Sequence, residues 1–214
     1  QMQFVGPKIR FQCILCGECC RRYWITVNLD DLARIYSHLG LPPSRVSALY
    51  PKSVAGNWDY PSLQVEGGEH YLVLRKKLDG ACIFTKWEGD RLACSIHDYR
   101  PLTCRYYPFI YRAGSVVSLE LFSGAVGYCP GVGRGNYHDL SGEASLVESS
   151  MAARRRFEEF ARQWNEGGGA GKSVAEFMRV LDEEVMKLTP SLGGPLRNDG
   201  GQQAKQGSDG VAHY

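Results

Sequence analysis

The sequence lacks the features that identify several common classes of protein. It has no run of 18 apolar residues, which a membrane-spanning helix would need. Its start, Gln1-Met2-Gln3-Phe4, has neither the basic nor the apolar segment of a secretory signal peptide. The formal net charge is only +2, so a general surface for nucleic acid is not predicted, and no internal repeats are visible. We therefore expect a cytoplasmic protein with neither membrane nor nucleic-acid partners.

Residues for acid–base or nucleophilic catalysis are also scarce. His70, His97 and His138 are isolated in the sequence. Catalytic use of them would require partners that the sequence does not place beside them. No catalytic residue is predicted.

Cysteine, in contrast, is abundant and clustered. Four of the eight cysteines fall within eight residues, and none lies beyond position 129. The eight are Cys13, Cys16, Cys19, Cys20, Cys82, Cys94, Cys104 and Cys129. In a reducing cytosol such clusters are more often metal ligands than disulfides. We predict that all eight bind metal.

The spacing of the first four thiols indicates two neighbouring centres. A CxxC step lets two thiolates reach one metal, and bacterial ferredoxins use CxxCxxC for three corners of a [4Fe–4S] cluster. Cys20 directly follows Cys19, and adjacent side chains diverge. One centre is therefore expected to take Cys13, Cys16 and Cys19, and the other Cys20. One later cysteine would complete the first centre and three the second, which accounts for all eight.

The type of metal follows less directly from the spacing. Zinc sites favour paired CxxC knuckles, and the four later cysteines contain no CxxC. We therefore favour iron–sulfur, with two [4Fe–4S] clusters, and keep zinc as the alternative. His97, three residues after Cys94, is a further candidate ligand, although eight thiols already satisfy two sites.

Buried anionic clusters need compensating charge and hydrogen-bond donors. Arg21 follows the first motif, and Arg100 and Arg105 flank Cys104. Backbone N–H groups of Gly131 and Gly133 follow Cys129. We predict that these five residues contact the cofactor. The glycine-rich run could instead bind phosphate, but no strand–turn–helix context supports that interpretation.

The overall pattern predicts an α+β fold. We expect a small, loop-rich domain of β-hairpins and helices wrapped around the metal centres over residues 1–140, two helices packed on it over 141–189, and a disordered tail over 190–214. Periodicity and caps predict the elements in the following list. Strands are expected at 9–13, 23–27, 71–74, 82–85 (a hairpin with 92–96) and 116–121; helices at 31–39, from Pro42 to about Tyr50, after Pro101, at 141–164 and at 174–188; and irregular structure at 51–68 and 129–135.

An ordered set of motifs resembles a known family. The motifs are Cys13-x-x-Cys16-Gly17-x-Cys19-Cys20, Cys82-x-Phe84 and Cys94-x-Ile96-x-x-Tyr99-Arg100-Pro101-x-x-Cys104-Arg105-x-Tyr107-Pro108-Phe109. They resemble the CxxCxxCC family, a zinc- or iron-chelating domain often labelled an Fe–S oxidoreductase, over roughly residues 10–135. Flagellin lysine N-methylases look like relatives that carry the same cluster.

The resemblance implies that the matching cysteines ligate metal. Three functions then compete: an iron–sulfur protein in a redox or accessory role, with an enzyme or redox protein as partner; a zinc-stabilised adaptor; and a methylase-like enzyme that modifies protein or nucleic acid and carries a cluster.

Overall fold

The computed structural model describes residues 4–6, 8–112, 116–138 and 144–192. The helices are α1 (Glu18–Arg22), α2 (Leu29–Leu39), α3 (Pro43–Val46), α4 (Lys52–Ala55), α5 (Leu102–Tyr106), α6 (Ala144–Glu166) and α7 (Val174–Leu188). The strands are β1 (Phe4–Val5), β2 (Arg10–Phe11), β3 (Ser47–Pro51), β4 (Leu63–Val65), β5 (Gly68–Leu74), β6 (Thr85–Glu88), β7 (Arg91–Cys94), β8 (Phe109–Arg112), β9 (Val117–Leu121) and β10 (Val132–Tyr137). The α+β prediction is confirmed.

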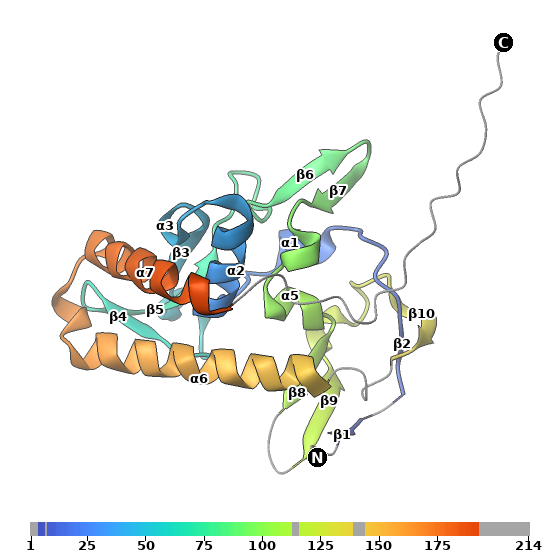
Figure 1. Ribbon diagram of the computed structural model, residues 1–214. Helices are drawn as coiled ribbons and strands as arrows, with labels where there is room; N and C mark the ends of the chain where they lie inside the picture. The colour runs from blue at the N-terminus through green and yellow to red at the C-terminus, as the bar shows by residue number, and fades with distance from the viewer. Residues whose placement is uncertain (1–3, 7, 113–115, 139–143, 193–214) are drawn as a thin grey trace.

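The strands form small, separate sheets rather than one large sheet. Strands β3, β5 and β4 form an antiparallel sheet in that order, and β6 and β7 form a hairpin. Strand β9 pairs with β1 in parallel and with β8 in antiparallel orientation, while β10 pairs with β2. In Figure 1 the two long helices α6 and α7 lie on one side of the chain, and β2 and β10 lie at the opposite edge. None of the described helices is both long and apolar enough to cross a bilayer.

Helix α2 begins at Leu29, two residues before its expected start at residue 31, and it ends at the expected Leu39. Asn28 accepts a hydrogen bond from the Asp31 backbone N–H (2.9 Å), and the Asp31 carboxylate accepts from the Asn28 N–H (3.3 Å). This capping box satisfies two amides that a helix start leaves without partners. Gly40 ends the helix in the left-handed region (φ 65°), where a side chain would be strained.

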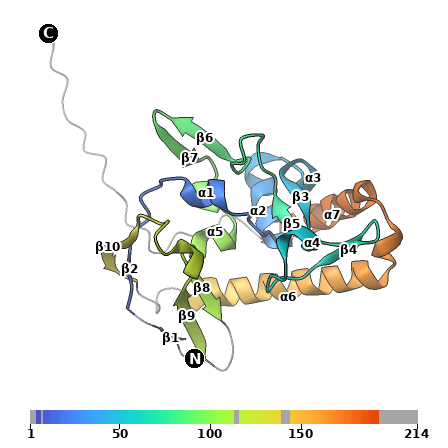
Figure 2. The ribbon, with the colours of Figure 1, turned by 180° about the vertical axis from the view of Figure 1, so that it is seen from behind.

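The C-terminal helices share one core with the first half of the chain. Phe157 and Trp164 of α6 and Phe177 of α7 are buried in the same cluster as Leu32 of α2 and Leu63 of β4. Figure 2 shows from behind that the β3–β5–β4 region faces these helices. The bounds of α7 match the expected 174–188, and Ser173 and Glu176 form a second capping box. The expected cap of α6 at Ser141 and most of the expected disordered tail, 193–214, lie outside the described residues, while Thr189–Leu192 forms a 3₁₀ turn.

Several predicted elements were wrong in extent or type. The helix expected up to Tyr50 ends at Val46, because the Ser47 hydroxyl donates to the Pro43 carbonyl (2.7 Å) and the chain then pairs with β5. The strand expected over 23–27 does not form. Residues 25–27 hydrogen-bond to the edge of β5 through a single bridge at Thr26.

Three further segments have a different secondary structure from the one predicted. The strand expected from Cys82 starts at Thr85, because the Thr85 N–H and hydroxyl both bond to the Cys82 carbonyl in a tight turn. The loop expected over 129–135 contains strand β10, and the irregular stretch 51–68 contains α4 and β4. At β4 and β10 a tertiary pairing partner overrides the local glycine or turn signal.

A paired arginine ties α6 to α2. Arg156 makes two hydrogen bonds to the carboxylate of Asp30, whose side chain is only 10% exposed. Replacing Arg156 with Ala should lower the free energy of unfolding by about 1–2 kcal/mol, because Asp30 would keep its charge without its partner. The measurement is urea unfolding, with the neighbouring exposed Arg155→Ala as the matched control. Equal effects of the two variants would contradict a specific tether.

Candidate metal centre

The cysteines gather around one cavity. Cys13, Cys16, Cys19, Cys20, Cys94, Cys104 and Cys129 line a space of about 630 Å³, and all eight cysteines are free thiols. Cys82 is not in the lining, but it is buried nearby and its N–H donates to the Cys20 carbonyl (2.9 Å). Segments far apart in the sequence therefore bring their cysteines together at one cavity.

The first motif is a tight turn followed by a short helix. Leu15 lies in the left-handed region (φ 56°), and Gly17 (φ 73°) caps α1. A Cβ on Gly17 would lie 2.6 Å from the Leu92 carbonyl oxygen, so only glycine allows the motif to pack against the β6–β7 hairpin. Cys19 and Cys20 both lie in α1, with their sulfur atoms 4.0 Å apart.

A buried ion pair holds the segment that carries Cys104. Asp31 accepts hydrogen bonds from Arg34 (2.7 Å) and from the N–H of Leu102 (3.0 Å), the first residue of α5. Arg34 in turn donates to the carbonyls of Tyr99 (3.2 Å) and Arg100 (3.1 Å). We call Asp31 and Arg34 the clamp. The sequence predicted Asp31 only as part of a helix over 31–39, since nothing in the local pattern connects it with residue 102.

The thiols differ in their readiness to ionise. A hydrogen bond from Cys20 lowers the pKa of Cys19 to about 7, helped by backbone N–H groups and the charge of Arg100 and opposed by burial. The same hydrogen bond raises the pKa of Cys20, and burial adds to this effect. Burial raises the pKa of Cys82 to about 11 and that of Cys104 well above its ordinary value. The buried thiols therefore keep their protons unless a cation compensates the thiolate.

Mutual charge effects divide the thiols into two neighbourhoods. The pKa of Cys129 is raised mainly by burial and then by the charges of Cys16 and Cys13. The pKa of Cys104 is raised mainly by burial and then by Cys19, Cys82 and Cys94. After the hydrogen bond from Cys19 and burial, the charges of Cys19, Cys104 and Cys94 also raise the pKa of Cys20. One neighbourhood therefore includes Cys13, Cys16 and Cys129, and the other Cys20, Cys82, Cys94 and Cys104, with Cys19 beside the second group.

The other predicted contact residues separate into two sets. Arg100, Arg105 and Gly131 line the cavity, and the N–H of Gly131 lowers the pKa of Cys129. Arg21 and Gly133 do not line it. The Arg21 guanidinium lies 5.1 Å from the centre of the exposed Trp87 ring, and Gly133 is exposed in β10.

Two more residues near the thiols, a lysine and a histidine, have side-chain nitrogen atoms. Lys76, which the sequence did not indicate, donates a hydrogen bond to the Arg21 carbonyl (2.9 Å). Burial lowers the pKa of Lys76, and the charges of Cys82 and Cys20 oppose that effect. A lysine three positions before a turn carries no local signal of this role. His97 lines the cavity, and burial followed by the charge of Arg100 lowers its pKa.

The thiols surround the cavity without converging on a point. Within the described ranges, no three His, Cys, Asp or Glu side chains form a group that could hold a single metal ion. Four thiolates on one zinc ion would place their sulfur atoms ~3.8 Å apart, given Zn–S bonds of about 2.3 Å. Cys19 and Cys20 are near that separation, but they are sequence neighbours in one helix.

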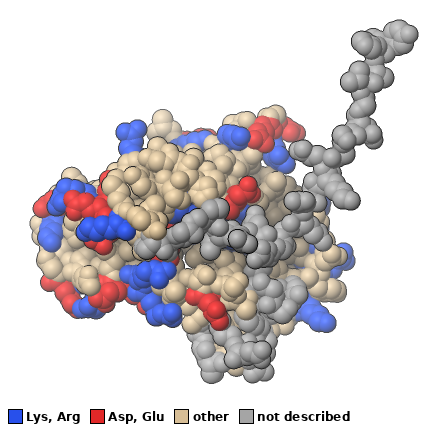
Figure 3. All heavy atoms as spheres, viewed as in Figure 1, with Lys and Arg blue, Asp and Glu red and all other residues tan. Residues whose placement is uncertain are grey.

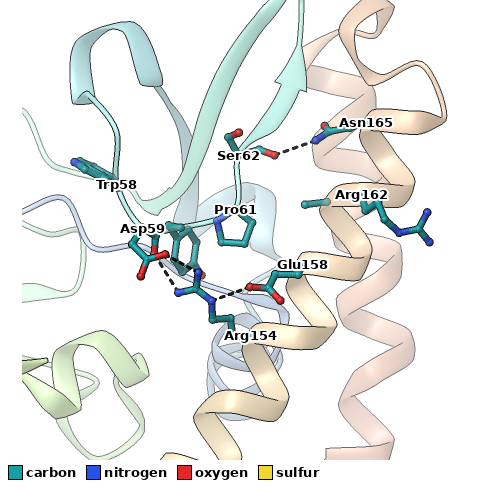
Figure 4. Close-up of a pocket in the computed structure, with 10 residues that line it drawn as sticks. Trp58, Asp59, Pro61, Ser62, Arg154, Glu158, Arg162 and Asn165 are labelled. Atoms are coloured by element: carbon teal, nitrogen blue, oxygen red, sulfur yellow. Dashed lines mark hydrogen bonds and ion pairs between the residues drawn. The ribbon is translucent and has the colours of Figure 1, made fainter. Parts of the chain in front are cut away.

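A second hollow lies between α6 and the segment before β4 and contains no cysteine. Its volume is about 370 Å³. Figure 4 shows that Arg154 points to both Asp59 and Glu158, with distances of 2.9 and 2.8 Å. Because these charges satisfy one another, this groove does not present an unpaired charge to a ligand.

Comparison with known families agrees with the geometry. A sequence model of the CxxCxxCC family, described as "Putative zinc- or iron-chelating domain", matches residues 12–130. The chain belongs to this family. All eight cysteines lie in the matched range, so the CxxCxxCC region is a zinc- or iron-chelating cysteine cluster. No curated protein and no solved structure matches the chain.

The lowered pKa of Cys19 predicts its reactivity in the metal-free protein. With a pKa of about 7 rather than 9.0, about half of Cys19 is thiolate at pH 7, against about one part in a hundred for an unperturbed thiol. We expect iodoacetamide to modify Cys19 first at pH 7, although Cys13 is the more exposed thiol, and the rate to fall as the pH drops below 7. Mass spectrometry of briefly treated samples measures this. Faster modification of Cys13 would contradict the expectation, and Cys20→Ser, which replaces the main partner, provides the comparison.

Proposed function

We propose that the protein is an iron–sulfur protein that carries two four-cysteine [4Fe–4S] clusters and serves a redox function. The observation that carries this proposal is the arrangement of seven thiols around one cavity of about 630 Å³. Chelation of zinc or iron follows from the family; the choice of iron–sulfur clusters is the proposal.

The spacing of the thiols supports clusters over single ions. A tetrahedral zinc site draws four sulfurs around one atom, whereas the thiolates of a [4Fe–4S] cluster bind four separate iron atoms. The cysteines line the walls of a large cavity instead of forming a compact group. Such an arrangement suits an inorganic group larger than one ion.

The two neighbourhoods of thiols suggest how the ligands divide. Cys13, Cys16 and Cys129 would hold the more exposed cluster, and Cys20 would join Cys82, Cys94 and Cys104 at the more buried one. Cys19 lies beside the second neighbourhood, and its assignment to the exposed cluster rests on the CxxCxxC spacing. Cys129 is then the later cysteine that completes the first centre. The charges of Cys16 and Cys13 raise the pKa of the Cys129 thiol in addition to burial, which supports this division.

The surroundings supply positive charge and N–H donors. Arg100 and Arg105 line the cavity, Lys76 lies near Cys20 and Cys82, and Gly131 N–H lies near Cys129. Cations and donors near cluster sulfur offset thiolate charge and tune the reduction potential. These groups would serve a redox cluster directly, and a structural zinc site needs them less.

Anaerobic purification followed by metal and sulfide analysis tests the proposal. We expect about eight iron atoms and eight labile sulfides per chain, with broad visible absorbance that dithionite bleaches. A colourless protein with stoichiometric zinc would overturn it. That result would support the second candidate, a zinc-stabilised scaffold, which the family description and the CxxC turn at Cys13 and Cys16 also favour.

A further inference from the structure

The surface beside the exposed thiols combines apolar and aromatic side chains. Ile14 and Leu15 are 39% and 38% exposed, and Val126 and Tyr128 are 59% and 53% exposed. Ile14 and Leu15 line the same cavity as Cys129. Tyr128 directly precedes Cys129. We call these four residues the apolar rim.

Two features of the apolar rim set it apart from an ordinary exposed loop. The Arg22 guanidinium lies 3.5 Å from the centre of the Tyr128 ring, a cation–π contact that joins α1 to the segment before Cys129. Leu15 adopts a left-handed backbone conformation that costs a non-glycine residue about 1–2 kcal/mol. The fold therefore keeps a strained and exposed leucine two residues from Cys13, the most exposed thiol. Burial of the leucine side chain does not account for this strain.

The charge around the apolar rim is mostly of one sign. The two segments that build this side of the cavity, residues 8–22 and 121–138, carry five basic residues and one acidic residue. The basic residues are Lys8, Arg10, Arg21, Arg22 and Arg134, and the acidic residue is Glu18; all six are exposed. No ion pair within the described part of the chain uses any of the five. In Figure 3 the edge over β2 and β10 shows Lys and Arg side chains and no Asp or Glu.

The rest of the surface has a different pattern. Over α6 and α7 basic and acidic side chains alternate, as Figure 3 shows, and form ion pairs such as Arg162 with Glu159 and Arg179 with Glu183. Of the Lys and Arg side chains on α6 and α7, all but Arg155 form ion pairs, whereas none of the five beside the metal cavity does so within the described residues.

We propose that the apolar rim and its surrounding cations dock an acidic electron-carrier protein beside the exposed centre. An apolar centre with a charged surround is the usual anatomy of a transient protein interface, and complementary charge speeds the encounter. A protein with an acidic surface fits better than a nucleic acid, because the rim contains branched aliphatic side chains, which pack against apolar protein side chains. This inference rests on the redox function proposed above and names the partner class for that site.

Binding of two carriers of opposite charge tests the inference. The probes are an acidic [2Fe–2S] ferredoxin and the basic cytochrome c, titrated calorimetrically into the metal-loaded protein at low and at high ionic strength. We expect saturable binding of the ferredoxin that weakens with salt, and none of the cytochrome. Equal binding of both carriers, or tighter binding of a single-stranded oligonucleotide than of the ferredoxin, would overturn the proposal.

Charge variants locate the surface. The double variant Lys8→Gln and Arg134→Gln should weaken ferredoxin binding about tenfold at low ionic strength, and the difference should vanish at high ionic strength. Arg179→Gln removes one charge from α7 and serves as the control, with an affinity within about twofold of the parent protein. Val126→Ser should weaken binding at both ionic strengths. Parent-like binding of the double variant would contradict the proposed surface.

The readouts separate the two proposals. A protein that contains zinc but still binds the acidic carrier in this pattern would retain the docking surface and refute the redox function. A protein with iron–sulfur clusters whose carrier binding does not depend on salt or on these side chains would support the redox function and refute the docking surface.

Discussion

Replacing Cys104 with Ser should remove the buried one of the two proposed clusters and leave the exposed one, so that about half of the iron and sulfide remains bound. Cys104 lies on α5 among Cys82, Cys94 and Cys19, whereas Cys129 lies with Cys13 and Cys16. Serine keeps the size of the side chain but is a far weaker ligand for iron. The measurement is metal and sulfide analysis of anaerobically purified variants.

Cys129→Ser provides the matched comparison. It should also lose about half of the metal, but from the exposed centre, so the two variants should differ in their paramagnetic resonance spectra after reduction. The double variant should bind almost none. If either single variant lost all metal while its far-ultraviolet circular dichroism stayed unchanged, the eight thiols would belong to one shared site.

Removing the carboxylate of Asp31 should be among the most destabilising single changes in the chain. Asp31→Ala would leave the buried Arg34 without its counter-charge and the N–H groups of Asn28 and Leu102 without an acceptor, at a cost of about 3–5 kcal/mol. Burial raises the pKa of Asp31, with Arg34 opposing that effect. Urea unfolding of the metal-loaded variant measures the loss.

The amide variant separates the role of charge from that of geometry. Asp31→Asn can still accept from Arg34 and Leu102 through one oxygen, but its NH₂ group would face the Asn28 N–H, so the cost should be smaller than for alanine. Because the clamp holds Tyr99, Arg100 and the start of α5, both variants should also perturb the spectrum of the buried centre more than that of the exposed one. Equal perturbation of both centres would mean that the clamp supports the fold in general.

The sequence predicted local features well and tertiary arrangements less well. The capped helices α2 and α7 were predictable because Asn28, Gly40 and Ser173 act within a few residues of themselves. The strand at 47–51 was not, because its stability comes from pairing with β5 far along the chain. The clustered thiols were predictable from spacing, since CxxC chemistry is local.

Residues that act on the thiols from a distance required the structure. Lys76 lies two residues after β5 and the clamp lies on α2, and both act near the cysteines through tertiary contacts that carry no sequence pattern. Arg21 shows the converse case: it adjoins the motif in sequence, yet its guanidinium lies over Trp87, outside the cavity lining. Adjacency in sequence is therefore a poor guide to which charged side chains lie beside the thiols.

The placement of the clamp has a consequence for the order of assembly. Asp31 and Arg34 belong to α2, which packs in the core with β4, α6 and α7, and this core contains none of Cys13, Cys16 and Cys129. The apoprotein can thus fold its core and set α5 in position before any metal arrives. On the proposed arrangement, we expect residues 8–16, which carry Cys13 and Cys16, to close last, over a buried centre that Cys20 of α1 has already joined, so that loading proceeds from the interior outward and a cluster donor finds the exposed thiols still accessible.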